Sequence, residues 1–230
     1  LKKGFINMND STFLFITKNH CLYDEVKKKL LPHQYLIVSS YENIEFKKNY
    51  NTLIDLTIFP TGNEKKAFLK KLGQYSIISD LTCYDGEALC NEIPTLFGAI
   101  ATAFPSPKKS VEFFAQNSTI KKAILEFGKL FNLNFVEVST PGIGFIYPRT
   151  LALIINEAYF SLQENLAKPN DIDTAMKFGV NYPLGPFEWS KIIGPDKIFI
   201  LLNELEKKTG KSRYKTSPSL YKEAKKYLSL

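Results

Sequence analysis

The amino-acid sequence predicts an α/β region, built on a shortened and degenerate Rossmann-like parallel sheet, followed by an all-α region. Up to about residue 140, short runs rich in β-branched and aromatic residues alternate with stretches of helical spacing. This alternation is typical of a doubly wound parallel sheet. After Thr140 only the helical spacing continues. We therefore expect a Rossmann-like domain over residues 8–140 and a helical domain over residues 141–230, with their boundary near residues 140–144.

Each expected strand of the first region is a short apolar run. The third run stops at Pro60 and Gly62, which are strong turn residues. Between runs, apolar residues recur at helical spacing, as with Leu22, Val26 and Leu30. Helices are expected at 21–31, at 64–72 with Asn63 as its N-cap, and at 118–130. Strands are expected at 12–17, 35–38, 53–59, 75–78, 97–104, 111–114 and 135–138.

The second region reads as four helices. The first, at 149–166, carries an apolar stripe formed by Leu151, Ile154, Ile155, Ala158 and Leu162. A helix capped by Asn170 and Asp171 should follow and run through residue 178, where glycine and proline residues break it. Pro195 opens a helix to about residue 208, which Gly210 closes. An amphipathic helix follows Pro218.

Composition excludes several classes of function. The chain of 230 residues is 44% hydrophobic, which is enough for real cores, and no window is apolar enough to span a membrane. Its net charge of +7 comes from lysines spread along the chain, with only Arg149 and Arg213 as arginines. Because nucleic-acid grooves favour arginine and interleaved aromatic residues, we do not expect nucleic-acid binding. A lysine-rich surface can attract the phosphates of a CoA-type ligand.

Cysteine and histidine usage points to a cytoplasmic protein without a metal site. The three cysteines cannot all pair, and His20 and His33 are the only histidines, so no zinc-ligand cluster is predicted. Unpaired thiols are typical of a reducing cytoplasm. The first residues are too short for a signal peptide, and Met8 is a candidate natural start.

The most informative residues lie between 149 and 196, where a series of short motifs follows in a fixed order. They are Arg149, then Asn156-Glu157-Ala158, then Asp171-Ile172-Asp173-Thr174-Ala175-Met176, then Tyr182-Pro183-Leu184-Gly185-Pro186-Phe187-Glu188, then Gly194 and Asp196. Together they resemble the helical C-terminal domain of the L-3-hydroxyacyl-CoA dehydrogenases, the family that includes 3-hydroxybutyryl-CoA dehydrogenase. Thr140-Pro141-Gly142 and Ser217-Pro218-Ser219-Leu220 also resemble segments of that family.

The resemblance implies an oxidoreductase of fatty-acid metabolism that passes hydride from a 3-hydroxyl group to NAD. It also implies that the helical domain closes over an acyl-CoA and mediates dimerisation. The stripe that begins with Leu151 is then a candidate homodimer face, and a core stripe within one chain fits the same pattern. Residues such as Asp173 and Pro186 are expected to shape helix ends and turns rather than to perform chemistry.

The parts of that family that bind NAD are missing here. A Gly-x-Gly-x-x-Gly turn should follow the first strand, but this chain has Thr17-Lys18-Asn19-His20-Cys21-Leu22. Ser39-Ser40 replaces the acid expected after the second strand, and Glu42 is a poor substitute. About a dozen residues, 41–52, stand in place of a long CoA-contacting helical excursion. We therefore expect no cofactor, or NAD if the family's activity survives.

The catalytic positions are also altered. The resemblance places Ala101 where the family has its catalytic histidine and Pro148 where it has a substrate-side asparagine. Glu112 matches the carboxylate that orients the histidine, and Thr82 keeps a hydroxyl where the family has a serine. Glu112 and Thr82 are thus the candidate catalytic residues. His20 lies far from this motif in sequence, so we do not expect it to replace the missing base.

Three functions compete. The first is a family member that has lost standard NAD-dependent hydride transfer and acts as an acyl-CoA-binding or dimerising homologue. The alternative is an active, divergent NAD-dependent L-3-hydroxyacyl-CoA dehydrogenase. A third, a different enzyme that reuses Thr82, Glu112 or a cysteine, has no motif of its own. The missing histidine and glycines favour the first.

Overall fold

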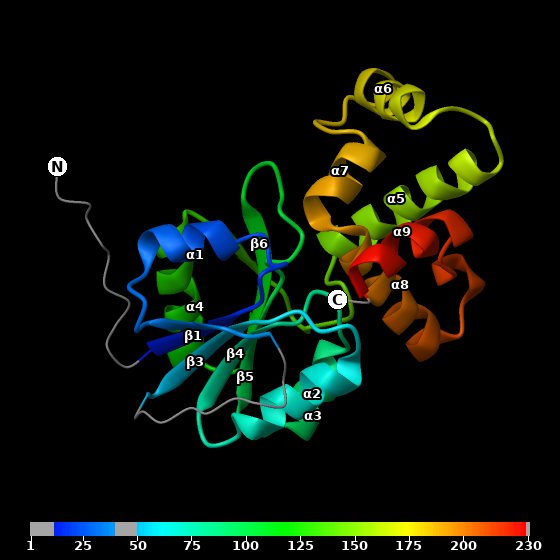
Figure 1. Ribbon diagram of the computed structural model, residues 1–230. Helices are drawn as coiled ribbons and strands as arrows, with labels where there is room; N and C mark the ends of the chain where they lie inside the picture. Colours follow the sequence, from blue (N-terminus) through cyan, green and yellow to red (C-terminus); the bar gives the residue numbers. More distant parts are fainter. Residues whose placement is uncertain (1–11, 40–49, 229–230) are drawn as a thin grey trace, which may run out of the picture.

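The computed structural model describes residues 12–39 and 50–228, and in this part of the chain a seven-stranded sheet is followed by a group of helices (Figure 1). The strand order is β2-β1-β3-β4-β5-β6-β7, and neighbours are parallel except for β5 and β6. The predicted α/β class is confirmed. The strands are β1 (Thr12–Ile16), β2 (Tyr35–Ile37), β3 (Thr52–Leu56), β4 (Ser76–Asp80), β5 (Leu96–Ile100), β6 (Ser110–Ala115) and β7 (Asn134–Glu137).

The antiparallel pair corrects the expectation of a wholly parallel sheet. Only residues 101–109 join β5 to β6. A parallel neighbour needs a crossover of about a dozen residues or more, usually with a helix, whereas an antiparallel neighbour can follow a short loop. Strands β3 and β5 also end earlier than predicted, at Leu56 and Ile100, because the residues after them turn into polar contacts at the carboxyl edge of the sheet.

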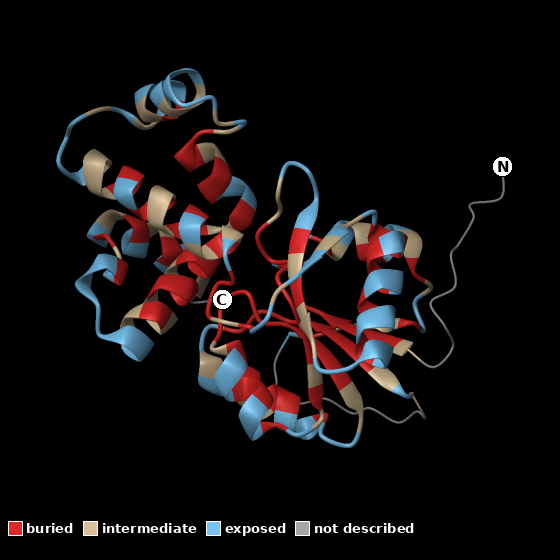
Figure 2. Ribbon diagram, turned by 180° about the vertical axis from the view of Figure 1, so that it is seen from behind, coloured by how far each residue is buried: buried red, intermediate tan, exposed pale blue. Residues whose placement is uncertain are grey.

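Helices cover both faces of the sheet (Figure 1). On one face, α1 (Tyr23–Lys29) and α4 (Ser118–Phe131) enclose a core that includes Leu14, Ile54 and Ile124. On the other face, α2 (Gly62–Lys71) and α3 (Gly86–Glu92) cover sheet residues such as Phe15, against which Phe68 of α2 packs. Alternate residues of each strand therefore point into different cores. Figure 2 shows this as a buried sheet between helices whose outer surfaces are exposed.

Two local predictions about the α2–α3 region need correction. The N-cap of α2 is Thr61 and not Asn63, because Thr61 and Glu64 form a reciprocal capping box. The short helix α3 was not predicted. It begins after Asp85, whose carboxylate accepts a hydrogen bond from the Ala88 amide at 3.1 Å. Its seven residues are too few to display a clear helical period in the sequence.

The remaining helices form a second body beside the sheet, with α6 at its outer end (Figure 1). The expected N-cap residues Asn170 and Asp171 lie inside α6, which begins at Pro169 after Lys168. Helix α7 was not predicted, because it is short and lies between helix-breaking residues. The bounds are α5 (Tyr147–Gln163), α6 (Pro169–Gly179), α7 (Pro186–Ile193), α8 (Pro195–Thr209), the 3-10 turn η1 (Ser212–Tyr214) and α9 (Pro218–Leu228).

The apolar stripe of α5 lies inside the chain. Leu151, Ile155 and Ala158 are buried, and α5 packs against α7, α8 and α9. Ile154 is only partly buried. These contacts match the interpretation of the stripe as an internal core. Among the described helices, none is both long and apolar enough to cross a membrane.

Candidate functional site

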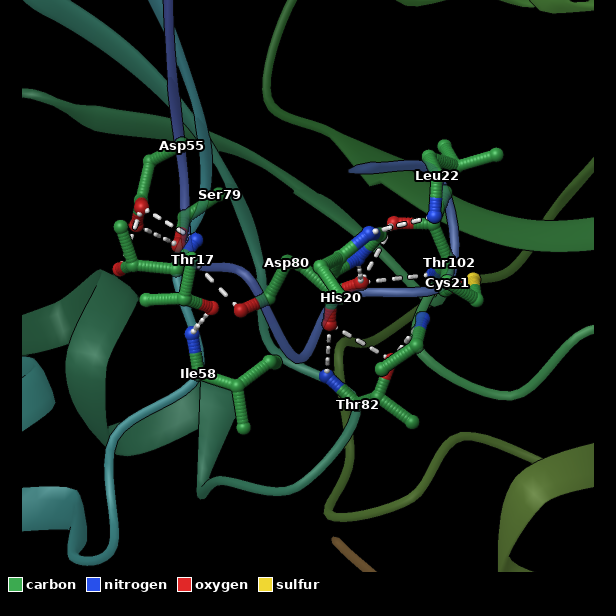
Figure 3. Close-up of polar contacts among 12 residues, drawn as sticks. Thr17, His20, Cys21, Leu22, Asp55, Ile58, Ser79, Asp80, Thr82 and Thr102 are labelled. Carbon is green, nitrogen blue, oxygen red and sulfur yellow. Dashed lines mark hydrogen bonds and ion pairs between the residues drawn. The ribbon is translucent and has the colours of Figure 1, made fainter. Parts of the chain in front are cut away.

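The same tripeptide, Asp-Leu-Thr, stands at the carboxyl ends of the neighbouring strands β3 and β4 and makes the same hydrogen bonds twice. Figure 3 shows Asp55 of the first copy and Asp80 and Thr82 of the second. At residues 55–57, the Thr57 amide and hydroxyl donate to the Asp55 carboxylate at 2.9 and 2.6 Å. At residues 80–82, Thr82 makes the same two bonds to Asp80 at 2.9 and 2.6 Å. Both carboxylates are fully buried. Each of them therefore needs further donors or a cation.

Asp80 finds its partner in the turn after β1. The Nε2 atom of His20 lies 3.3 Å from one Asp80 carboxylate oxygen, and the same oxygen accepts bonds from the amide and the hydroxyl of Thr102. His20 is only 2% exposed. We call His20, Asp80, Thr82 and Thr102 the His20 cluster. It joins the ends of β1, β4 and β5, with His20 reaching past the end of β3.

Hydrogen bonding fixes the ring of His20. Its Nδ1 atom accepts from the Leu22 amide at 3.1 Å, so this nitrogen carries no hydrogen and Nε2 is the donor to Asp80. Burial alone would raise the pKa of Asp80. The bonds from His20, Thr102 and Thr82 outweigh that effect and hold the pKa of Asp80 below its usual value. Both ring nitrogens are thus used inside the protein.

Asp55 is neutralised by a lysine. The Lys65 Nζ atom lies 2.6 Å from the Asp55 carboxylate and 2.7 Å from the Thr57 carbonyl oxygen, and both side chains of the ion pair are fully buried. The Ser79 hydroxyl donates to the same Asp55 oxygen at 2.7 Å. Tyr84 packs its ring against Lys65. A buried ion pair of this kind has a structural role, because removing either partner would leave an unpaired charge inside the protein.

Cys21 lies beside the cluster but is not an activated thiol. Its Sγ atom donates to the Thr102 carbonyl oxygen at 2.9 Å. Although other atoms of Cys21 are exposed, burial of the thiol raises its pKa to about 12. A thiol that stays protonated is a weak nucleophile. Burial likewise raises the pKa of Cys83 and of Cys90.

The two predicted catalytic residues occupy different surroundings. Thr82 belongs to the buried His20 cluster, where its hydroxyl donates to Asp80. The Glu112 carboxylate instead accepts from the amides of Ile146 and Tyr147, at 3.0 and 3.2 Å, where α5 begins. No hydrogen bond between described residues links Thr82 to Glu112. A catalytic role for either residue stays a prediction.

The substituted positions have structural roles. Ala101 is buried and its amide donates to the Glu112 carbonyl oxygen at 2.9 Å. Pro148 stands in the first turn of α5, where a proline needs no hydrogen-bond partner. No sequence pattern places His20 near Ala101, yet in the structure its ring contacts Thr102, the next residue. The repeated Asp-Leu-Thr is the signal that could have revealed this site.

The residues that carry the family resemblance hold the helices together. Arg149 donates to the Tyr214 hydroxyl and stacks over its ring. Asn156 donates to the Lys215 carbonyl oxygen at 3.0 Å and accepts from the Ser217 amide at 2.9 Å. These contacts join α5 to the segment that precedes α9.

A second group joins α6 to α7. Asp173 accepts from the Phe187 and Glu188 amides at 2.8 and 3.2 Å, so it caps α7 rather than its own helix. Glu188 accepts from the Gly185 amide at 2.8 Å, and the Asp173 side chain leaves no space for a Cβ atom at Gly185. We see in these contacts helix capping and not chemistry.

The residues after β1 do not fit an ordinary dinucleotide. A pyrophosphate needs a glycine-lined turn and the free N-terminus of the next helix. Here the His20 ring fills the turn, and Asp24 and Glu25 in the first turn of α1 place negative charge where phosphate would lie. Ser39 is exposed at the end of β2, while Ser40 and Glu42 lie outside the described residues, as does Met8. The described residues contain no group of histidine, cysteine or acidic side chains that could hold a metal ion.

Comparison with known proteins agrees with the architecture. Residues 144–227 match the family model described as the C-terminal domain of 3-hydroxyacyl-CoA dehydrogenase. The 3-hydroxyadipyl-CoA dehydrogenase of Escherichia coli K12 is 47% identical over 72 residues, which are 31% of this chain and only 15% of that relative. The 3-hydroxybutyryl-CoA dehydrogenase of Clostridioides difficile is 27% identical over 213 residues, 85% of this chain and 72% of that protein.

A solved structure supports the fold of the whole chain. The crystal structure of FadB2 from M. tuberculosis superposes with a TM-score of 0.63 at 13% identity, covering 89% of this chain and 78% of that one. A mostly parallel seven-stranded sheet followed by helices defines a two-part protein of the Rossmann-like class. The match over residues 144–227 makes the class specific. The chain is thus a homologue of the 3-hydroxyacyl-CoA dehydrogenases, and its residues 144–227 match the C-terminal domain of that family.

Proposed function

We propose that the chain is an acyl-CoA-binding member of this family that has lost standard NAD-dependent hydride transfer. One observation carries the proposal: the buried His20 ring occupies the turn in which the cofactor's pyrophosphate would lie. Ala101 also leaves the family's base position without a titratable group. The acyl-CoA ligand is inferred from the family and from the retained helical region.

The His20 cluster is a poor replacement for the missing base. Oxidation of a hydroxyl requires a group within hydrogen-bond reach that can take its proton. Nδ1 of His20 accepts from Leu22, and Nε2 faces Asp80 and Thr102 at 3.3 and 3.2 Å. A substrate would have to displace one of these partners from a ring that is almost fully buried. This geometry favours a structural histidine.

A divergent NAD-dependent dehydrogenase is the second candidate, and the comparisons favour it over the first. Each of the two relatives described above is named as a dehydrogenase acting on a 3-hydroxyacyl-CoA. The structure adds one observation in its favour, because a histidine and a carboxylate do meet at the carboxyl edge of the sheet. Rearrangement of the turn after β1 would be required before that pair could reach a substrate.

One experiment separates the two candidates. Purified protein at micromolar concentration is mixed with NADH and acetoacetyl-CoA, and absorbance is followed at 340 nm. The first candidate predicts no loss of absorbance, together with a rise in melting temperature on adding acyl-CoA but not NAD. Turnover that depends on His20 would establish the second candidate. A chain that is inert to every CoA ester would contradict both.

We also propose a cytoplasmic homodimer formed through the helical region. Free thiols at Cys21, Cys83 and Cys90 suit a reducing compartment. For the dimer, the support is apolar surface at the outer end of this region, where Phe178 is 84% exposed and Leu166 is 70% exposed. Light scattering on the purified chain tests the dimer, and a monomer at all concentrations would refute it.

A further inference from the structure

A cavity of about 630 Å³ lies at the carboxyl ends of β1, β2 and β3, and residues at the junction of α7 and α8 also line it. This size falls within the range of small-molecule sites. Its apolar lining includes Val38, Ile58, Phe59 and Ile193. Apolar walls of this kind suit a flat heterocyclic ring. The His20 cluster fills the neighbouring edge of the sheet but leaves this cavity open.

The rim of the cavity is basic. Three lysines, Lys18, Lys191 and Lys197, line it together with one acid, Asp196. Lys197 is already committed, since its Nζ atom donates to the Asn19 carbonyl oxygen at 2.9 Å and lies 3.9 Å from the Asp196 carboxylate. Lys18 and Lys191 are exposed. Lys191 is near enough to Glu188 to help lower the pKa of that carboxylate, which is held mainly by Lys177. Two positive charges are therefore available to an anion at the rim.

The end of β2 indicates where that anion belongs on the ligand. In dinucleotide-binding sheets, an acid at this place binds the ribose hydroxyls, whereas a nearby cation accommodates a ribose phosphate. Here the place is taken by Ser39, which is exposed and lines the same cavity as the lysines. A serine neither repels a phosphate nor competes with it for a lysine. Among the described residues that line the cavity, none at the end of β2 is an acid that would select an unphosphorylated ribose.

We propose that this cavity binds an adenosine whose ribose carries a phosphate, with the purine against the apolar wall and the ribose phosphate at Lys18 and Lys191. CoA and NADP both contain such a group. The inference deepens the proposed function and depends on it only if CoA is the source. It does not require a pyrophosphate to cross the turn occupied by His20.

Calorimetric titration of the full chain tests the proposal. The probes are 3′,5′-ADP and 2′,5′-ADP, with AMP as the comparison that lacks the ribose phosphate. We expect one of the two bisphosphates to bind about tenfold more tightly than AMP, since a charge-assisted bond is worth roughly that factor. The Lys18→Ala and Lys191→Ala double variant should lose this advantage. Lys122→Ala removes an exposed lysine from the distant helix α4 and should change nothing.

A second variant works by repulsion and does not depend on losing a side chain. Ser39→Asp restores an acid at the end of β2, and it should weaken the bisphosphates severalfold while leaving AMP unaffected. Circular dichroism checks that each variant is folded. Because Ser39, Lys18 and Lys191 are all exposed, folding should not change.

The outcomes are distinct. Equal affinity for AMP and both bisphosphates, or lysine and Ser39 variants that behave like the parent, would overturn the inference. Binding of CoA without NADP identifies CoA as the source, and the reverse result identifies NADP. Stabilisation by acyl-CoA without any binding of the bisphosphates would overturn the inference but leave the proposed function standing. Bisphosphate binding without any response to acyl-CoA would support the inference and contradict the proposed function.

Discussion

Replacing His20 is the most direct test of how the carboxyl edge of the sheet is held together. In His20→Ala, Asp80 loses one donor but keeps the amides and hydroxyls of Thr82 and Thr102. The buried Asp80 carboxylate therefore keeps most of its hydrogen-bond donors in this variant. A hydrogen bond to a buried charged group contributes about 1.5–3 kcal/mol. The lost packing of an enclosed ring adds roughly 1 kcal/mol, so we expect destabilisation of about 2.5–4 kcal/mol.

The assay is urea unfolding followed by circular dichroism, with the fluorescence of Trp189, the single tryptophan, as a second probe. His20→Gln is the informative partner variant, because a glutamine amide can still donate to Asp80. It should recover about half of the loss. His33→Ala removes the other histidine, which is exposed, and should stay within about 0.5 kcal/mol of the parent. If His20→Ala were as stable as His33→Ala, the structural role assigned to His20 would be wrong.

Three further predictions concern single side chains. Glu112→Ala should cost about 1–2 kcal/mol in urea unfolding, because two amides at the start of α5 lose their acceptor, while Glu112→Gln should cost less. Burial raises the pKa of Glu204, while Lys207 opposes the rise and Asp85 adds to it. The stabilising contribution of Glu204 is therefore present at low pH and lost as the pH rises through the raised pKa. Glu204→Gln should melt at a higher temperature than the parent at pH 7 and at the same temperature at pH 4, and equal melting temperatures at pH 7 would contradict this. The Cys21 thiol, with its pKa raised to about 12, should react with iodoacetamide at pH 7.5 far more slowly than free cysteine, and a rate like that of the free amino acid would count against its burial.

Most of the fold could be predicted because its signals are local. Apolar runs such as residues 12–17 identify a strand, and Gly210 marks the end of α8, where it adopts a left-handed conformation with φ of 65°. The failures have physical causes. The helices α3 and α7, of seven and eight residues, are too short to show a period. The direction of β6 depends on the length of the loop before it, which a strand pattern does not encode.

The site was harder to predict because it is made of long-range contacts. His20 and Asp80 are 60 residues apart and meet only because β1 and β4 lie on either side of β3. The motif resemblance correctly led to the family, but it directed attention to Glu112 and Thr82 through their alignment and not through their neighbours. The repeated tripeptide at residues 55–57 and 80–82 was visible in the sequence and marks two buried acids. Which side chain pairs with each of them, Lys65 with Asp55 and His20 with Asp80, is decided by the fold.

The two buried acids imply an order of folding. Asp55 and Lys65 are separated by ten residues, so their pair closes a short loop within the β3–α2 unit. The contact between Asp80 and His20 instead joins segments that are 60 residues apart. Because longer loops cost more entropy to close, we expect the β3–α2–β4 unit to gain protection before β1 docks. Pulse-labelled hydrogen exchange during refolding measures this order, and simultaneous protection of β1 and β3 would exclude it. The turn after β1, which carries His20 at the carboxyl edge of the sheet, would then be among the last parts of the α/β region to become native.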